Sequence, residues 1–283
     1  PAVADSAIVS TFDGAYAAED KLAGYTTSAS VLPGEVLKLR VRSAGTWSVK
    51  IIRIGSHAGG DGRVIDSLTN QPVSSQPDCT MTADTLMVSC PWNDTLSFAT
   101  GSWPTGLYVA RLESSDGYAL APFVVRSSNN AGKTVVNYGL TTVAAYNKFG
   151  GTSAYRGIDN TAVGKAKVVS FDRPIDSAWA LPHFIRHEAS VAIAADRNLT
   201  DAAWTTSVDM HSGATSLSGV TSIITSGHDE YWTVAQRKAL DKALSKGTNL
   251  FITGGNTLYW RVRLQASSVG ANRQMAIYKE KSA

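Results

Sequence analysis

The hydrophobic period of this chain changes near its middle, and that change limits the possible fold more than any other feature. Between Leu22 and Val125 the segments 36–42, 47–54 and 106–114 alternate apolar with polar residues, and Gly- and Pro-rich turns separate them. Such alternation is typical of strands that bury one face. We therefore predict that residues 1–127 form an immunoglobulin-like β-sandwich domain.

Nearly continuous apolar runs replace this alternation after residues 127–133, which we interpret as a linker. Runs of this length are typical of strands buried on both faces of a parallel sheet. We expect strands at 134–140, 165–171, 190–195, 220–225 and 249–254.

The segment 233–247 has a helical pattern instead, with Thr233 and Gln236 in the spacing of a capping box and Gly247 placed to end the helix. Strands that alternate with such helices predict an α/β domain over 133–283, similar to flavodoxin or glutamine amidotransferases. The predicted architecture is thus multidomain, β followed by α/β. The α/β domain looks incomplete, because 273–283 resembles a strand that leads onward. A further segment or a second chain could complete it.

Composition excludes some partners. The chain is 43% hydrophobic and 17% charged, as in ordinary globular proteins, and its formal charge is only +3. Its basic residues are scattered, so nucleic acid is a poor candidate partner. No apolar run approaches the roughly 20 residues of a membrane helix, so we expect no membrane span.

The two cysteines, Cys79 and Cys90, bracket a segment that has the pattern of a hairpin. A disulfide between them would stabilise the fold by about 3 kcal/mol in the chain-entropy model. The alternative is two separate buried thiols. The chain begins at Pro1 in a small-residue sequence like those beside signal cleavage sites. Together these features predict a secreted or periplasmic protein.

Reactive side chains are concentrated between the predicted strand 220–225 and the predicted helix: His228, Asp229 and Glu230 follow one another there. This is the carboxyl edge of the predicted sheet, where open α/β folds bind ligands. The next strand also ends in a polar, Gly-rich turn that contains Asn256. Tyr146 follows the first α/β strand and precedes a double glycine, which suits close approach of a ligand to the backbone.

Four motifs, "TTVAAYNKFGG" (141–151), "VVSFDRP" (168–174), "SGHDEYW" (226–232) and "GGNTLYWRVRL" (254–264), occur in this order. In these motifs and in the strands before them, the chain resembles the large (β) subunit of N,N-dimethylformamidase. The resemblance implies a mononuclear Fe(III) site with two tyrosines and one glutamate as ligands and a histidine nearby. Glu230 and His228 match its H-D-E arrangement, Tyr146 matches one tyrosine, and Tyr108 is the best match for the other. Tyr155 and Tyr231 are the substitutes for Tyr108.

An iron-dependent hydrolase of amide or other C–N bonds follows from this resemblance. Metal-activated water would attack a metal-polarised carbonyl, with His228 as the general base. We expect Asn256 to donate a hydrogen bond to the carbonyl oxygen, and Asp229 to orient the loop. The substrate would be a small-molecule amide.

Two other functions remain open. A secreted binding protein could retain the site in vestigial form, or the same ligands could hold iron for redox chemistry. One family feature is missing, because the family enzyme uses another glutamate well beyond its H-D-E motif and this chain ends before a counterpart. We interpret His183 and His187 as a structural or surface pair and His211 as solvated. A homo-oligomer is compatible with the sequence.

Overall fold

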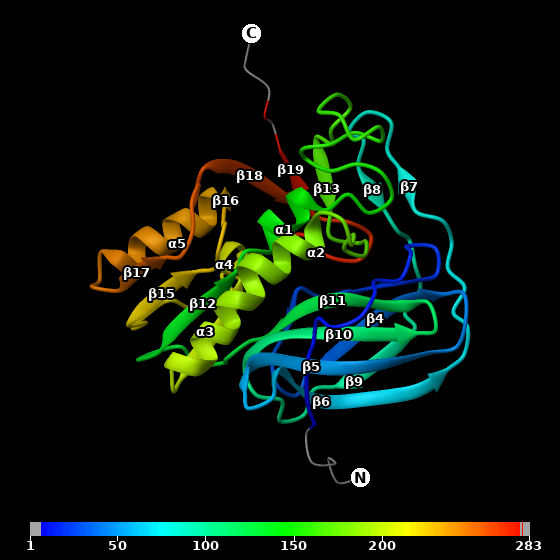
Figure 1. Cartoon of the computed structure of the whole chain (residues 1–283). Helices are drawn as coiled ribbons and strands as arrows, with labels where there is room; N and C mark the ends of the chain where they lie inside the picture. Colours follow the sequence, from blue (N-terminus) through cyan, green and yellow to red (C-terminus); the bar gives the residue numbers. More distant parts are fainter. Residues whose placement is uncertain (1–6, 278, 280–283) are drawn as a thin grey trace.

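The computed structural model describes residues 7–277 and 279. These residues form mainly β-strands, arranged in several sheets with helices packed against them (Figure 1). None of the described helices is long and apolar enough to cross a membrane.

Two sheets form the N-terminal part. The larger has the strand order β1-β6-β5-β10-β11-β3, and the smaller has the order β2-β4-β9. Their strands are β1 (Ile8–Val9), β2 (Leu22–Thr26), β3 (Ser30–Val31), β4 (Val36–Ser43), β5 (Trp47–His57), β6 (Gly60–Gln71), β9 (Leu96–Ala99), β10 (Gly106–Ser114) and β11 (Gly117–Val125).

The six-stranded sheet is a middle layer that is buried on both faces. Tyr108 and Ala110 of β10 join the core between the two sheets, whereas Leu107 and Val109 pack on the helical side of the molecule. Neighbouring residues of a strand point to opposite faces, so all four are buried only because both faces are covered. The alternation that we predicted for this strand is therefore lost in its first half.

A parallel sheet follows, with the order β14-β12-β15-β17. Its carboxyl ends meet at one edge, as the sequence predicted for β12, β15 and β17. Helix α5 follows the loop after β15, and Thr233 and Gln236 form its capping box as expected. The helix ends at Leu244, ahead of Gly247, which closes the next turn with a φ of 93°. The elements are β12 (Thr134–Tyr138), α1 (Leu140–Tyr146), β14 (Ala202–Thr206), α4 (Ser207–Ser212), β15 (Ser222–Thr225), α5 (Val234–Leu244) and β17 (Asn249–Ile252).

A smaller mixed sheet, β13-β19-β18-β16, lies beside the carboxyl edge of the parallel sheet (Figure 1). It pairs Tyr231 in β16 with Trp260 in β18. Its strands are β13 (Val168–Ser170), β16 (Tyr231–Thr233), β18 (Trp260–Gln265) and β19 (Gln274–Ala276).

Two strand predictions are wrong: one segment is a helix, and the other is a strand of a different sheet. Residues 190–195 lie in a helix that runs continuously through α2 (Ala180–His183), the π-helix η1 (Phe184–Ala189) and α3 (Ser190–Asn198). Alanine is the best helix former, and Ala192 and Ala195 supply a buried stripe at helical spacing. The run 165–171 does contain a strand, β13, but it pairs antiparallel with β19 rather than joining the parallel sheet. Strand β14 was missed.

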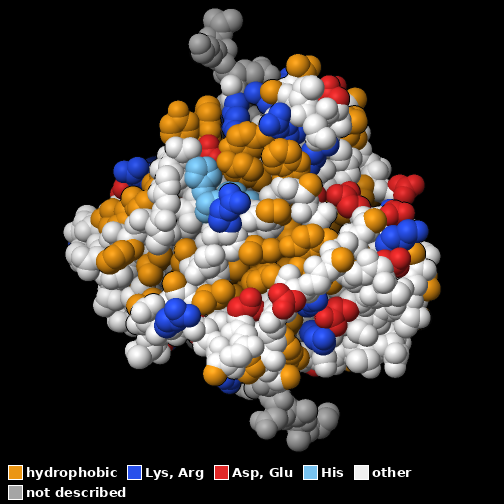
Figure 2. All heavy atoms as spheres, in the orientation of Figure 1, with side chains coloured by type: hydrophobic (Ala, Val, Ile, Leu, Met, Phe, Trp, Pro, Cys, Tyr) orange, Lys and Arg blue, Asp and Glu red, His pale blue; other side chains and the backbone are white. Residues whose placement is uncertain are grey.

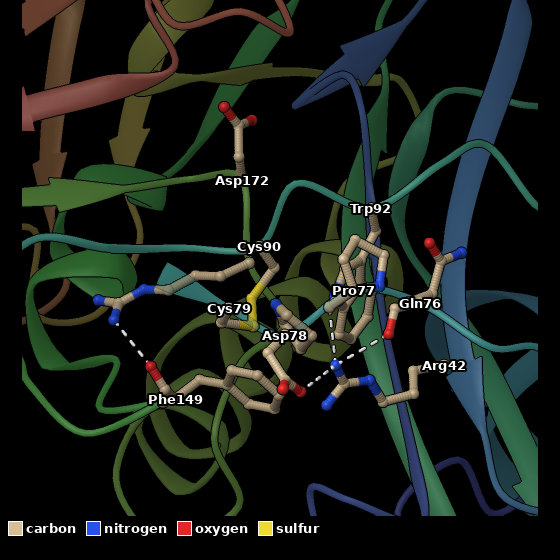
Figure 3. Close-up of a disulfide and its surroundings, with 12 residues drawn as sticks. Arg42, Gln76, Pro77, Asp78, Cys79, Cys90, Trp92, Phe149 and Asp172 are labelled. Atoms are coloured by element: carbon tan, nitrogen blue, oxygen red, sulfur yellow. Dashed lines mark hydrogen bonds and ion pairs between the residues drawn. A yellow bond between two sulfur atoms is a disulfide. The ribbon is translucent and has the colours of Figure 1, made fainter. Parts of the chain in front are cut away.

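Cys79 and Cys90 form the predicted disulfide. It closes the hairpin of β7 (Thr80–Met81) and β8 (Val88–Ser89). Figure 3 shows the disulfide beside the side chains of Trp92 and Phe149. The centroids of these two rings are 6.4 Å apart. The Cys90 amide donates to the Asp172 carbonyl, and Gly150 packs against Val88, so the hairpin also braces the loops that follow α1.

Candidate functional site

The loop between β15 and β16 carries His228, Asp229 and Glu230 at the carboxyl edge of the parallel sheet. Helix α1 starts at the same edge and fixes this loop. The Thr142 hydroxyl accepts hydrogen bonds from the backbone amides of Glu230 (2.9 Å) and Tyr231 (3.2 Å). The neighbouring Thr141 hydroxyl donates to the Tyr231 carbonyl at 2.7 Å. The same helix ends at Tyr146 and so delivers this side chain to the loop.

One carboxylate oxygen, Oε2 of Glu230, is the meeting point of the site. The Tyr155 hydroxyl lies 2.6 Å from it, His228 Nε2 lies 3.3 Å away and the Tyr146 hydroxyl 3.4 Å. Tyr231 donates its hydroxyl hydrogen to Tyr155 at 2.6 Å. Glu230 is only 4% exposed, so these groups replace water around a buried acid.

Tyr146 and Tyr155 belong to a column of stacked rings. The Tyr146 ring stacks on His183 at 4.4 Å and on Tyr155 at 4.5 Å between centroids. The Lys279 ammonium lies 3.4 Å from the centroid of Tyr155. One ring face cannot hold both neighbours, so the order is His183, Tyr146, Tyr155, Lys279. A cation over a phenol ring stabilises negative charge there and holds the ring in place.

His183, at one end of the column, belongs to a group of three histidines. The centroids of His183 and His187 are 4.5 Å apart, and His228 lies 6.0 Å from the first and 5.9 Å from the second. Burial lowers the pKa of His183 to about 3, and it also lowers the pKa of His187, so both stay neutral at pH 7. Figure 2 shows histidine side chains at the surface, next to hydrophobic and basic side chains.

From the sequence we interpreted His183 and His187 as a structural or surface pair. We did not predict that both lie beside His228. Their spacing of four on one helix was the available signal, but the third histidine comes from a distant loop. The π-helix η1 contains His187. Its wider turn changes which residues face the site, and π-helical segments are frequent at functional sites. The structure places His211 elsewhere, where its Nδ1 contacts the Thr233 hydroxyl at 2.9 Å.

A buried polar network supports the loop from below. Asp229 accepts a hydrogen bond from Asn137 Nδ2 at 2.7 Å, and Ser226 donates its hydroxyl hydrogen to Glu188. Asp229 and Glu188 are both 0% exposed, and burial raises their pKa to about 7 and about 8 respectively. Asp229 Oδ1 and Glu188 Oε1 have no hydrogen-bond partner among the described residues, and both face Gly139.

Tyr108 does not lie at this site, in contrast to our expectation that it supplies a ligand. Its ring is fully buried among Trp103 and Phe123, and its hydroxyl donates to the Pro104 carbonyl at 2.7 Å. The pleat of β10 directs it into the core between the two N-terminal sheets. Tyr155 and Tyr231, the substitutes, are the tyrosines that join Tyr146 at Glu230.

Asn256 lies in the adjacent loop between β17 and β18. Its side chain is exposed, its φ is +55°, and none of its described contacts reaches Glu230. The loop itself does touch the site, because the Leu258 amide donates to the Asp229 carbonyl at 3.0 Å.

The donor set at Glu230 suits a hard, oxygen-liganded cation. No group of three or more His, Cys, Asp or Glu with metal-binding geometry occurs among the described residues, so a metal here would need phenol oxygens. One carboxylate and two tyrosine hydroxyls already converge within hydrogen-bond distance. Burial raises the pKa of Tyr146 and Tyr155, and these phenols would ionise only beside a strong Lewis acid. The residues fit ferric iron better than zinc.

The structure thus combines a β-rich fold with a carboxylate, tyrosines and a histidine at the carboxyl edge of a parallel sheet. The sequence model of the family described as N,N-dimethylformamidase beta subunit-like, C-terminal, matches residues 48–283. The chain therefore belongs to this family, as its motifs predicted. A search of curated proteins finds no match.

Proposed function

We propose that this chain is an iron-dependent hydrolase of amide or other C–N bonds. The family supports hydrolase chemistry of the dimethylformamidase type. The observation that carries the proposal is the convergence of Tyr146, Tyr155 and His228 on one oxygen of Glu230. A carboxylate with two phenols is a hard donor set that becomes anionic when the phenols ionise, and such a set suits a trivalent cation.

Tyr146, Tyr155 and Glu230 would hold the iron. When bound, Fe(III) would act as a Lewis acid that polarises the amide carbonyl and lowers the pKa of water. Tyr231 and Lys279 hold Tyr155 in position through its hydroxyl and its ring face. The stack on His183 fixes the plane of Tyr146 in the same way.

His228 is the proposed general base. Its side chain is 20% exposed, so it can reach both the buried carboxylate and a substrate in the open part of the site. Its imidazole takes a proton from the attacking water while the water oxygen bonds to the carbonyl carbon. The C–N bond then breaks, and the imidazolium returns the proton to the amine nitrogen. The products are a carboxylic acid and an amine. Asn256, in the neighbouring loop, is the proposed hydrogen-bond donor to the carbonyl oxygen.

Metal loading tests this proposal directly. We expect purified protein to take up stoichiometric iron and to show a broad visible band from phenolate-to-iron charge transfer. Tyr155→Phe and Glu230→Gln should lose the band, whereas Tyr108→Phe should keep it because Tyr108 lies in the N-terminal core. His228→Asn should keep the band and lower amide hydrolysis by roughly 10²–10⁴-fold. Protein that stays colourless and free of added iron would instead support a binding protein with a vestigial site.

We further infer two domains, an immunoglobulin-like sandwich over 1–127 and an α/β domain over 133–283. The disulfide favours an oxidising compartment and hence export. The exposed side chains of Phe251 and Ile252 in the edge strand β17 leave room for a further segment or a second chain against the parallel sheet.

A further inference from the structure

A pocket of about 340 Å³ opens beside the tyrosine column. It is lined by Tyr146, Ser153, Tyr155, Arg156, Ala162 and Trp179. Two of these residues are the tyrosines that reach Glu230, so whatever fills the pocket lies next to the proposed reaction centre. The volume falls within the range of about 300–1,000 Å³ typical of ligand sites, and a small formamide would fill only a minor part of it.

The pocket is also lined by the partly exposed indole of Trp179. Trp179 is 41% exposed, and a 2.6 Å hydrogen bond from its backbone amide to Asp176 Oδ1 fixes the main chain from which the indole extends. An exposed tryptophan that lines a pocket offers a flat apolar surface for an aromatic ring. With Tyr146 and Tyr155 it makes most of the pocket surface aromatic.

Arg156 supplies the charge of the pocket. Its guanidinium lies 5.4 Å from the centroid of Trp179, and one of its nitrogens, Nη1, donates to the Asn160 carbonyl at 2.9 Å. No carboxylate of the described residues pairs with it, so most of its N–H donors point at solvent or into the pocket. A guanidinium with free donors binds a carboxylate through two parallel hydrogen bonds.

We propose that this pocket selects N-acylated amines that carry both an aromatic ring and a carboxylate. The carboxylate binds Arg156, the ring packs on Trp179, and the amide carbonyl reaches the Glu230 site past Tyr155. Because Arg156 and Trp179 are in contact, the ring and the carboxylate of the ligand need to be only a few bonds apart. The position of the amide rests on the proposed function, whereas the recognition of ring and carboxylate rests on the pocket alone.

Calorimetric binding of N-acetylphenylalanine, its neutral carboxamide and N-acetylglycine tests the proposal without any turnover. We expect the acid to bind roughly 10–100-fold more tightly than the carboxamide, as a charge-assisted hydrogen bond requires. N-acetylglycine, which has no ring, should also bind more weakly than N-acetylphenylalanine.

Two variants assign these effects to residues. Arg156→Met should weaken the acid to the level of the carboxamide and leave the carboxamide unchanged. Trp179→Leu should weaken both ring-bearing ligands and spare N-acetylglycine. Arg63→Met, at an exposed arginine of β6 outside the pocket, should bind all three ligands as the wild type does. Thermal unfolding of each variant verifies that it is folded.

The possible outcomes separate this inference from the proposed function. Equal binding of acid and carboxamide, or an acid affinity that Arg156→Met leaves intact, overturns the selectivity proposed here even if simple amides are hydrolysed. Binding of the acid that depends on Arg156, without hydrolysis by iron-loaded protein, supports the pocket and contradicts the hydrolase proposal.

Discussion

Glu188 shows how far a single buried acid can differ from its behaviour in water. It is fully buried, one oxygen accepts from Ser226 and from the Gly139 amide, and the other oxygen has no partner in the part of the chain that the structure describes. Burial, together with the charge of Asp229, raises its pKa to about 8 from 4.5. Glu188 is therefore mostly protonated at pH 7, and it supports the loop as a neutral group.

Replacing Glu188 with glutamine should make the protein less sensitive to pH. The unfolded state releases the proton of Glu188 near pH 4.5 and the folded state only near pH 8, so the free energy of unfolding falls as pH rises between these values. Glu188→Gln removes this contribution and should gain stability relative to the wild type by about 1 kcal/mol or more per pH unit across that window. Urea unfolding at pH 5, 6, 7 and 8 measures the difference.

Glu113→Gln is the matched control because the pKa of Glu113 is shifted in the opposite direction, downward rather than upward. Burial alone would raise the pKa of Glu113, but hydrogen bonds from Lys50 and Arg111 lower it overall. Its ionised form is therefore stabilising above the unfolded pKa, and that stabilisation is lost as pH falls through the lower folded pKa. Glu113→Gln should lose stability at neutral pH. A Glu188→Gln variant with the same pH slope as the wild type would show that Glu188 is ionised when folded.

At the scale of elements, the site depends on the fit between η1 and the loop after β15. Gly227 has a φ of +47°, and a Cβ there would lie 2.2 Å from the Cβ of His187 and 2.7 Å from its Cα. A methyl group at that position overlaps backbone, which a side-chain rotation cannot relieve. The absence of a side chain at Gly227 lets His187 approach His228.

Gly227→Ala should therefore separate η1 from the loop. We expect a loss of about 2 kcal/mol or more of unfolding free energy, from positive-φ strain plus overpacking, and weaker iron binding. Gly213→Ala isolates the strain alone, because Gly213 has a φ of +77° and nothing lies within 4 Å of an added Cβ. It should lose only about 1 kcal/mol. Equal losses in the two variants would mean that the contact with His187 is not tight.

Patterns of neighbouring residues in the sequence predicted those helices and strands that depend mainly on neighbouring residues. The capping box of α5 and the strands β12, β15 and β17 were predicted, and they place His228 and Glu230 at the correct edge of the sheet. The helix over 190–195 was not predicted, because a short apolar run can belong to a strand or to a buried helix. The choice of Tyr155 over Tyr108 was not predicted either. Both sit in plausible segments, and only tertiary packing decides which hydroxyl reaches Glu230.

On the scale of the whole molecule, one of the hydrophobic clusters is shared between the six-stranded sheet and the helical part. Ile52 and Val109 of the six-stranded sheet pack in the same cluster as Phe184, Ala192 and the other apolar residues of the helical layer. Figure 1 shows α3 between the parallel sheet and the strands β5 and β10. A shared core of this kind couples the unfolding of its two sides, because separating them exposes apolar surface on both.

Asp196 in α3 ties the two sides together at the edge of this core. It accepts from Arg53 Nη1 at 2.8 Å and from the Ser56 amide at 2.9 Å, both in β5, and its side chain is only 19% exposed. Asp196→Asn should lower the free energy of unfolding by about 1–3 kcal/mol, because Arg53 then loses a largely buried charge partner. The variant and the wild type should each unfold in one transition, with far-ultraviolet circular dichroism and tryptophan fluorescence changing together.

Asp94→Asn removes a carboxylate that also accepts from an arginine, Arg40, but within the N-terminal sheets and at a more exposed position. Its cost should be below about 1 kcal/mol. If the sandwich and the α/β part were independent, Asp196→Asn would instead split unfolding into two transitions or leave stability unchanged. A single transition shifted by Asp196→Asn more than by Asp94→Asn means that the sandwich stabilises the helix that carries His187. The N-terminal sheets would then support the site although none of their side chains reaches Glu230 through a described contact.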